Sequence, residues 1–146
     1  MNLMARLAAA LALTLAATGA HAANVLVVLS DENHLDLKDG RVLSTGFFLN
    51  ELMQPVKVLL DAGHEVTFAT PQGRAPTADA SSVTPAYFGN DSAQLQVHKD
   101  LLEKLALTSQ TASPVLSLAR VEQQGYAHFD AVYLRRSGST AATRGR

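Results

Sequence analysis

The stretch TGFFLNELMQP, residues 45–55, runs on through DAGHEVTFATP, residues 61–71, and decides the fold. Its apolar residues recur every three or four positions, which is the pattern of one face of an amphipathic helix. We expect Thr45 to cap the N-terminus of this helix and Gly63 to end it in a left-handed conformation. Pro55 removes one backbone hydrogen bond from the helix interior and tends to kink it. The expected buried face consists of Phe48, Leu49, Leu52, Met53, Val56, Leu59 and Leu60.

Three apolar runs before and after this helix predict buried strands. Residues 24–30 contain a continuous apolar run, which is typical of a parallel strand covered on both faces. Residues 64–70 follow the helix, and such βαβ units are right-handed almost without exception. We expect a second helix over 92–107, capped by Ser92, and a third strand over 130–134. The pattern predicts an α/β protein with a flavodoxin-like, doubly wound parallel sheet, truncated after the third strand.

The segments between these elements are expected to be mostly irregular. Residues 31–44 form a polar loop, and residues 71–91 form a loop rich in Pro, Ala, Ser, Thr and Gly. Residues 113–122 predict a short extended piece, and residues 123–129 a helical turn or a loop. Long loops near the carboxyl edge of a parallel sheet are often functional.

Glu51 is the candidate site residue. It is the only acid between Asp39 and Asp61, and it lies one turn before Pro55. A carboxylate near the start of a helix that follows a parallel strand lies near the carboxyl edge of the sheet, where open α/β folds place their sites. The alternative is that Glu51 is an ordinary solvated helix residue.

This order of elements carries a resemblance to a known family. A strand, an acid-bearing loop, residues 45–55 and then DAGHEVTFATPQGRAP, residues 61–76, resemble the ThiJ/PfpI superfamily of the class I glutamine amidotransferase-like fold, in its chaperone and glyoxalase-III-type branch. The resemblance covers residues 24–134, and its most specific part is the E-x-x-x-P helix. The sequence departs from the family at Arg74, where a second glycine is expected.

The resemblance implies thiol-dependent glyoxalase, deglycase or amidase chemistry on small carbonyls or peptides, or chaperone activity. Glu51 matches the acid that hydrogen-bonds the nucleophilic thiol in this family, and such a pair holds the sulfur and couples both titrations. This sequence has no cysteine and lacks the family's P-G-G-H-G turn after the third strand. Whether it is an enzyme is therefore left open. We interpret it as an inactive fragment, and the alternative is a non-catalytic binding or holdase module completed by a partner.

Residues 135–146 differ from the rest of the chain in composition. They have four arginines, no acid and no apolar residue larger than alanine, so we expect a disordered basic tail. The change falls where the family has its glycine-rich turn, and we interpret it as a frameshift or a premature end. The predicted organisation is a signal peptide over 1–22, a partial ThiJ/PfpI-like domain over 23–134 and this tail.

Residues 1–22 have the three parts of a secretory signal. Arg6 lies in the n-region, residues 7–17 form the apolar h-region, and Ala20-His21-Ala22 is an A-x-A cleavage site. The apolar run of 7–17 is too short to span a bilayer, so no stable membrane anchor is expected. The predicted location is periplasmic or secreted, with cleavage after Ala22.

Charge and composition limit the partners. Residues 24–134 hold 7 basic and 13 acidic side chains, and this acidic body argues against a nucleic-acid partner. Without cysteine, neither a disulfide nor a thiolate ligand can form. The expected partners are a small carbonyl or peptide substrate, as in the family, and a second copy of the chain if the domain is intact.

No metal or cofactor is expected. The acid pair Asp31 and Glu32 is similar to a receiver phosphorylation site, but Arg135 stands where that site needs an aspartate. No glycine-rich phosphate loop and no G-x-S-x-G elbow is present. His64 is expected at a strand start, and His98 and His128 at the surface. The histidines of the predicted mature chain, which lack metal-binding spacing, are His34, His64, His98 and His128.

Overall fold

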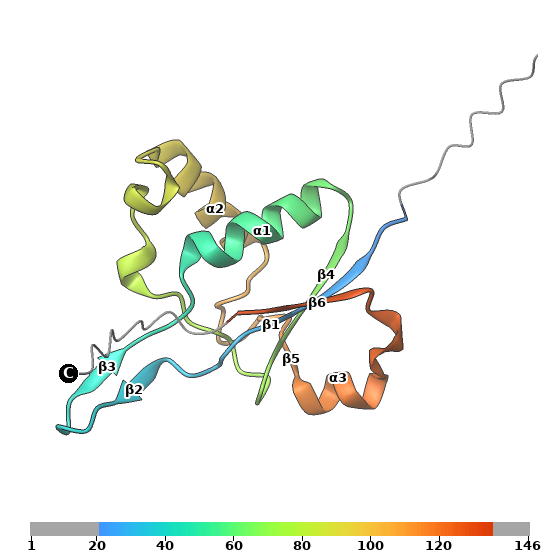
Figure 1. Cartoon of the computed structure of the whole chain (residues 1–146), viewed down its shortest axis with the longest axis horizontal. Helices are drawn as coiled ribbons and strands as arrows, with labels where there is room; N and C mark the ends of the chain where they lie inside the picture. The colour runs from blue at the N-terminus through green and yellow to red at the C-terminus, as the bar shows by residue number, and fades with distance from the viewer. Residues whose placement is uncertain (1–20, 136–146) are drawn as a thin grey trace, which may run out of the picture.

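A four-stranded parallel sheet forms the centre of the protein (Figure 1). The computed structural model describes residues 21–135, and the predicted signal and most of the predicted tail lie outside the described residues. The strands are β1 (Asn24–Val28), β4 (Glu65–Thr70), β5 (Leu116–Ser117) and β6 (Ala131–Leu134), in the order β5-β4-β1-β6. All three neighbouring pairs run parallel.

Helices cover both faces of the sheet. Helices α1 (Leu49–Asp61) and α2 (Ser92–Lys104) lie on one side, and α3 (Leu118–Gln124) lies on the other (Figure 1). The side chains of β1 alternate accordingly: Val25 and Val27 pack in the cluster under α1, whereas Leu26 packs with Val121 of α3. In the order β5-β4-β1-β6, the first strand lies inside the sheet between β4 and β6, as it does in open doubly wound sheets. The predicted fold class is confirmed.

The sheet and its connections also contain elements that the sequence reading missed. A fourth strand, β5, pairs with the end of β4. The predicted loop over 31–44 contains an antiparallel hairpin of β2 (His34–Asp36) and β3 (Val42–Ser44). The predicted extended piece over 113–122 is wrong after β5, because α3 begins at Leu118. Short 3-10 helices complete the described chain: η1 (Ala80–Ser82), η2 (Pro85–Phe88) and η3 (Tyr126–His128).

The cap predicted at Thr45 is wrong. Helix α1 begins after Phe48, which makes no side-chain cap hydrogen bond. The hydroxyl of Ser82, from the loop after β4, instead accepts the Leu49 N–H at 2.9 Å, so a distant segment satisfies the helix start. Gly63 follows the helix with φ of +81°, as predicted.

The N-terminus of α2 is also capped differently from the prediction. The carboxylate of Asp91, one residue before Ser92, accepts the N–H groups of Ala93 and Gln94. An aspartate is as good a cap as a serine, and the sequence offers both side by side.

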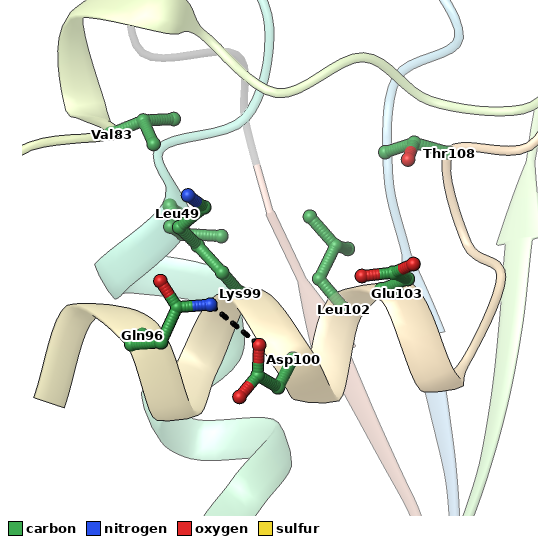
Figure 2. A pocket seen from close by; sticks show the side chains of 8 residues that line it. All are labelled: Leu49, Val83, Gln96, Lys99, Asp100, Leu102, Glu103 and Thr108. Atoms are coloured by element: carbon green, nitrogen blue, oxygen red, sulfur yellow. Dashed lines mark hydrogen bonds between the residues drawn. The ribbon is translucent and has the colours of Figure 1, made fainter. Parts of the chain in front are cut away.

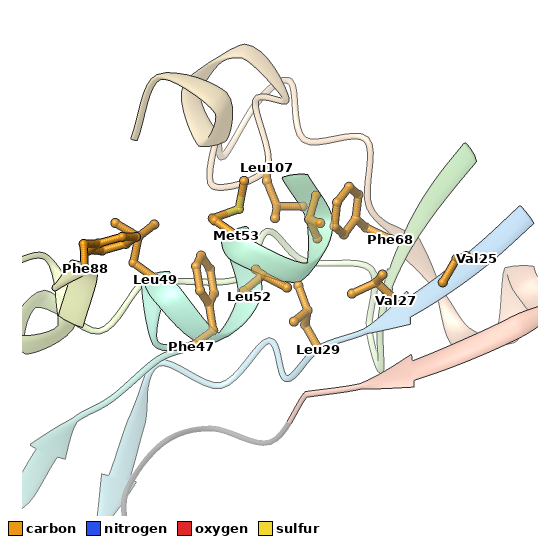
Figure 3. Close-up of a cluster of buried hydrophobic side chains, with 11 residues drawn as sticks. Val25, Val27, Leu29, Phe47, Leu49, Leu52, Met53, Phe68, Phe88 and Leu107 are labelled. Carbon is orange, nitrogen blue, oxygen red and sulfur yellow. The ribbon is translucent and has the colours of Figure 1, made fainter. Parts of the chain in front are cut away.

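The main hydrophobic core lies between α1 and the sheet (Figure 3). Leu49, Leu52 and Met53 of α1 are fully buried, as the helical periodicity predicted. They pack with Val27 of β1, and Leu107, in the segment after α2, closes the cluster (Figure 3). This packing fixes the first turn of α1 above the carboxyl end of β1. Within residues 21–135, no helix has the length and apolarity needed to cross a membrane.

Candidate functional site

Glu51 lies in the first turn of α1, at the carboxyl edge of the sheet. Its side chain is 44% exposed, and its carboxylate reaches the end of β6. The helix that carries it is held by the core beneath and by Ser82 at its start. The structure therefore places the predicted site residue where an open α/β fold carries its chemistry.

The guanidinium of Arg135 forms an ion pair with the Glu51 carboxylate. The backbone N–H of Arg135 donates to the Val28 carbonyl at 2.9 Å, which continues the ladder between β6 and β1 for one more residue. The Arg135 side chain is only 18% exposed, and burial lowers its pKa from the ordinary value. An arginine still remains a cation at any physiological pH, so the pair is charged on both sides.

A second contact joins β6 to the same turn of α1. The hydroxyl of Tyr133 donates to the backbone carbonyl of Glu51 at 2.9 Å. In an α-helix that carbonyl would accept the N–H of residue 55, which is Pro55 and has none. Helix α1 nevertheless runs through Pro55 without a break. Tyr133 supplies the donor that the proline removes.

These contacts limit what Glu51 does chemically. The guanidinium of Arg135 holds the Glu51 carboxylate, and the hydroxyl of Tyr133 holds the Glu51 backbone carbonyl. No thiol nucleophile lies beside the carboxylate, since the sequence contains no cysteine. The ion pair between Glu51 and Arg135 connects α1 to the end of β6.

A second polar cluster lies at the carboxyl end of β1. The buried carboxylate of Asp31 accepts the Gln72 N–H at 2.8 Å and lies 3.7 Å from Nε of Arg74. Arg74 also bonds Glu32 at 3.0 Å. The residue that departs from the family pattern thus neutralises the acid pair. This arrangement ties the loop after β4 to β1 and leaves no free carboxylate pair of the receiver type.

The structure brings no metal-binding set together. Within residues 21–135, no three His, Asp or Glu side chains are placed to hold a metal ion. His128 is exposed, as predicted, and His64 lies immediately before β4. The prediction for His98 is wrong: it is buried, packs on the ring of Phe88 at 5.0 Å and contacts the Gln94 carbonyl at 2.7 Å.

A separate hollow of about 360 Å³ lies beside α2 (Figure 2). Its lining is mixed: Leu49 and Leu102 contribute apolar surface, while Lys99 and Glu103 contribute charged groups. Gln96 donates to Asp100 at 2.6 Å within the same helix, so part of its polar lining is already satisfied (Figure 2). None of the residues predicted for the site lines this hollow.

Sequence comparisons identify no relative of this chain. No family model matches it, and no curated protein matches its sequence.

A comparison of structures does find a likeness. The crystal structure of glyoxalase III from Candida albicans superposes on 80% of this chain with a TM-score of 0.54 and 20% sequence identity. The chain has the fold of glyoxalase III. At this identity the likeness establishes the fold alone. The match covers 44% of glyoxalase III, so this chain spans less than half of that protein.

The sequence reading found Glu51 but missed both of its partners. Arg135 has the composition of the basic tail, because it begins a run with no apolar residue larger than alanine. The alternation of side chains along a strand could have predicted both contacts. If the strand extends by one residue, residues 131, 133 and 135 lie on the same face. That Glu51 occupies the position of the family's thiol-partner acid remains a prediction carried by the resemblance, and this sequence has no thiol for it to partner.

Proposed function

We propose that this chain is a thiol-free scaffold of ThiJ/PfpI type that does not itself carry out the thiol-dependent glyoxalase, deglycase or amidase chemistry implied by the resemblance. The ion pair between Glu51 and Arg135 supports the proposal. In place of a sulfur, the carboxylate at the family's acid position faces a guanidinium.

The physical argument is one of magnitude. General acid–base catalysis by one positioned side chain contributes roughly 10²- to 10⁴-fold, well below what a covalent nucleophile and a prepared oxyanion site provide together. The Glu51 carboxylate is, in addition, already engaged in an ion pair with Arg135. A single compromised carboxylate is therefore expected to leave carbonyl substrates at their background rate.

The proposal is tested by incubating the purified chain with methylglyoxal and following loss of the substrate. We expect the rate to equal that of buffer and that of Glu51→Gln, with a cysteine-containing glyoxalase III as the positive control. Turnover above background that disappears in Glu51→Gln would show that this chain is catalytic without a thiol and would end the proposal.

A second candidate function is a polypeptide-binding module. One observation favours it: within residues 21–135, the outer side of β6 has no neighbouring strand. An open strand edge offers its backbone groups to another chain. A holdase of this kind would suppress aggregation of a denatured client without a thiol, and a Val132→Lys substitution on the edge would weaken that suppression.

Export is part of the same proposal. It is supported by the signal-like residues 1–22, of which only His21 and Ala22 belong to the described chain. Mass spectrometry of protein recovered from an osmotic-shock fraction is expected to give the chain beginning at Ala23. Recovery of the uncleaved chain from the cytoplasm alone would contradict it.

A further inference from the structure

The bond that the signal motif marks for cleavage lies immediately before the first residue that the fold holds. The A-x-A site predicts cleavage between Ala22 and Ala23. Ala22 is exposed, as is His21 before it. Ala23 is only partly exposed, and both of its backbone polar groups are bonded. Its N–H donates to Nδ1 of His64 at 3.0 Å, and its carbonyl accepts the N–H of Glu65 at 2.9 Å.

The next residue, Asn24, is held by the opposite side of the sheet. Its N–H donates to the carboxylate of Asp130 at 2.8 Å, and its carbonyl accepts the Asp130 N–H, also at 2.8 Å. Its side-chain amide donates to the carbonyl of His128 at 3.1 Å. Asn24 is the first residue of β1, which lies between β4 and β6. Within the described chain, Ala23 alone separates the predicted cleavage bond from this inner strand.

These hydrogen bonds conflict with the way a peptidase binds its substrate. An extended substrate is held through its backbone groups, and here the sheet already uses those that follow the bond. Cleavage at such a site requires that the segment first leave the fold. Release of β1 is demanding, because Val25 and Val27 are buried under α1, and Leu26 is buried on the side of α3.

We propose that residues 1–22 are removed before the sheet forms, and that the folded domain protects the bond between Ala22 and Ala23 from the signal peptidase. This inference rests on the export proposal, because it concerns the same cleavage. The chain must then reach the peptidase unfolded, as the cargo of the general secretory route does. The n-region agrees with that route, since it has the single arginine Arg6 and no arginine pair of the twin-arginine type.

The cleavage itself leaves the contact with His64 in place. Water supplies a hydroxyl to the carbonyl carbon of Ala22 and a proton to the nitrogen of Ala23, so the released nitrogen becomes an α-amino group. That group still carries hydrogen-bond donors and can donate to Nδ1 of His64. A cut at this bond therefore removes the residues that precede the fold and none of the contacts of Ala23.

The test compares two histories of the same full-length chain in the same final buffer. In one, the chain is refolded, its folding is checked by circular dichroism, and signal peptidase in detergent micelles is then added. In the other, the chain is diluted from urea directly into the peptidase. Mass spectrometry follows the appearance of the chain that begins at Ala23. We expect the refolded chain to be cleaved at least about tenfold more slowly, because the peptidase acts only on its transiently open population.

Two insertion variants show whether the sheet is the cause of the protection. Insertion of Gly-Ser-Gly-Ser between Ala23 and Asn24 moves the bond away from β1 and leaves the cleavage motif unchanged. We expect this variant to be cleaved equally fast after either history. The matched control carries the same insertion after Gly40, in the exposed turn between β2 and β3, and should stay protected. Thermal melts check that both variants fold.

Equal rates for the two histories of the unmodified chain would overturn the proposal. Equal cleavage of the two refolded insertion variants would also overturn it, because the protection would then not depend on the start of β1. Either result leaves the export proposal intact. If the chain diluted from urea is not cut between Ala22 and Ala23, the predicted cleavage site is wrong, and the export proposal is rejected together with this inference.

Discussion

The hydroxyl of Tyr133 donates a hydrogen bond to the backbone carbonyl of Glu51, at 2.9 Å, across 82 residues of sequence. That carbonyl is the one that Pro55 leaves without its helical donor. The two residues thus act together: Pro55 leaves an acceptor free on α1, and Tyr133 of β6 donates a hydrogen bond to it, which holds β6 against the helix. Both flank the carboxylate at the centre of the candidate site.

Replacing Tyr133 with phenylalanine is expected to lower the free energy of unfolding by about 1 kcal/mol, because it leaves the Glu51 carbonyl without a protein donor. The measurement is urea denaturation followed by circular dichroism. In a Pro55→Ala background residue 55 regains an N–H, so the same substitution should be nearly neutral. Equal losses in both backgrounds would show that the hydroxyl and the proline are not coupled.

The ion pair between Glu51 and Arg135 is expected to contribute little stability. Glu51 is 44% exposed, and solvent screens pairs of this kind to about 1 kcal/mol or less. A double-mutant cycle with Glu51→Gln and Arg135→Gln should give a coupling in that range, and 1 M salt should reduce it. A coupling above about 3 kcal/mol would indicate a buried pair instead.

Much of this fold could be predicted from the sequence because its strongest signals are local. The buried run of β1 and the helical period of α1 depend only on neighbouring residues. The sequence also placed Glu51 at the carboxyl edge, since a helix that follows a parallel strand must begin there. The fold that the resemblance implied is also the fold of glyoxalase III, to which the structure is similar.

The errors concern contacts between distant segments. Thr45 looked like a cap because it is a threonine ahead of a helical pattern, yet Ser82, 33 residues from Leu49, is the acceptor. The Thr45 hydroxyl is buried and has no partner within the described chain. His98 has the neighbours of a surface residue in sequence, but Phe88 folds back over its ring. Local pattern does not encode such contacts.

Ser82 is expected to matter more than an ordinary helix cap. Its hydroxyl accepts the Leu49 N–H and donates to the Asp79 carbonyl, and the side chain is fully buried. Ser82→Ala should reduce the free energy of unfolding by about 1–2 kcal/mol, because water cannot replace the lost acceptor.

The matched control for Ser82 is Ser117, which caps α3 by accepting the Arg120 N–H at 3.1 Å in an exposed position. Ser117→Ala should have a smaller effect, of about 0.5 kcal/mol, since solvent reaches that N–H. If both substitutions have the same effect in chemical denaturation, burial of the cap does not decide its contribution.

Gly46 is expected to be the most sensitive glycine of the described chain. The N–H of Phe47 donates to Thr77, and the Phe47 carbonyl accepts from Asp79, both at 2.9 Å, so two backbones lie side by side at Gly46. A Cβ on Gly46 would lie 2.2 Å from the Thr77 carbonyl oxygen, which is backbone and cannot rotate away. Gly46→Ala should therefore destabilise by at least about 2 kcal/mol, through separation of the two segments.

Gly63 provides the comparison for Gly46. It has φ of +81° and open space around its Cβ position, so Gly63→Ala carries only the penalty of a left-handed alanine, about 1 kcal/mol. We expect Gly46→Ala also to loosen the start of α1, because Phe47 leads directly into it, and hence to accelerate amide exchange at Leu52. The contrary result is a Gly46→Ala protein with unchanged amide exchange at Leu52 and a loss of unfolding free energy no larger than that of Gly63→Ala. It would mean that the loop around Thr77 moves to make room. The position of Glu51 would then not depend on this contact.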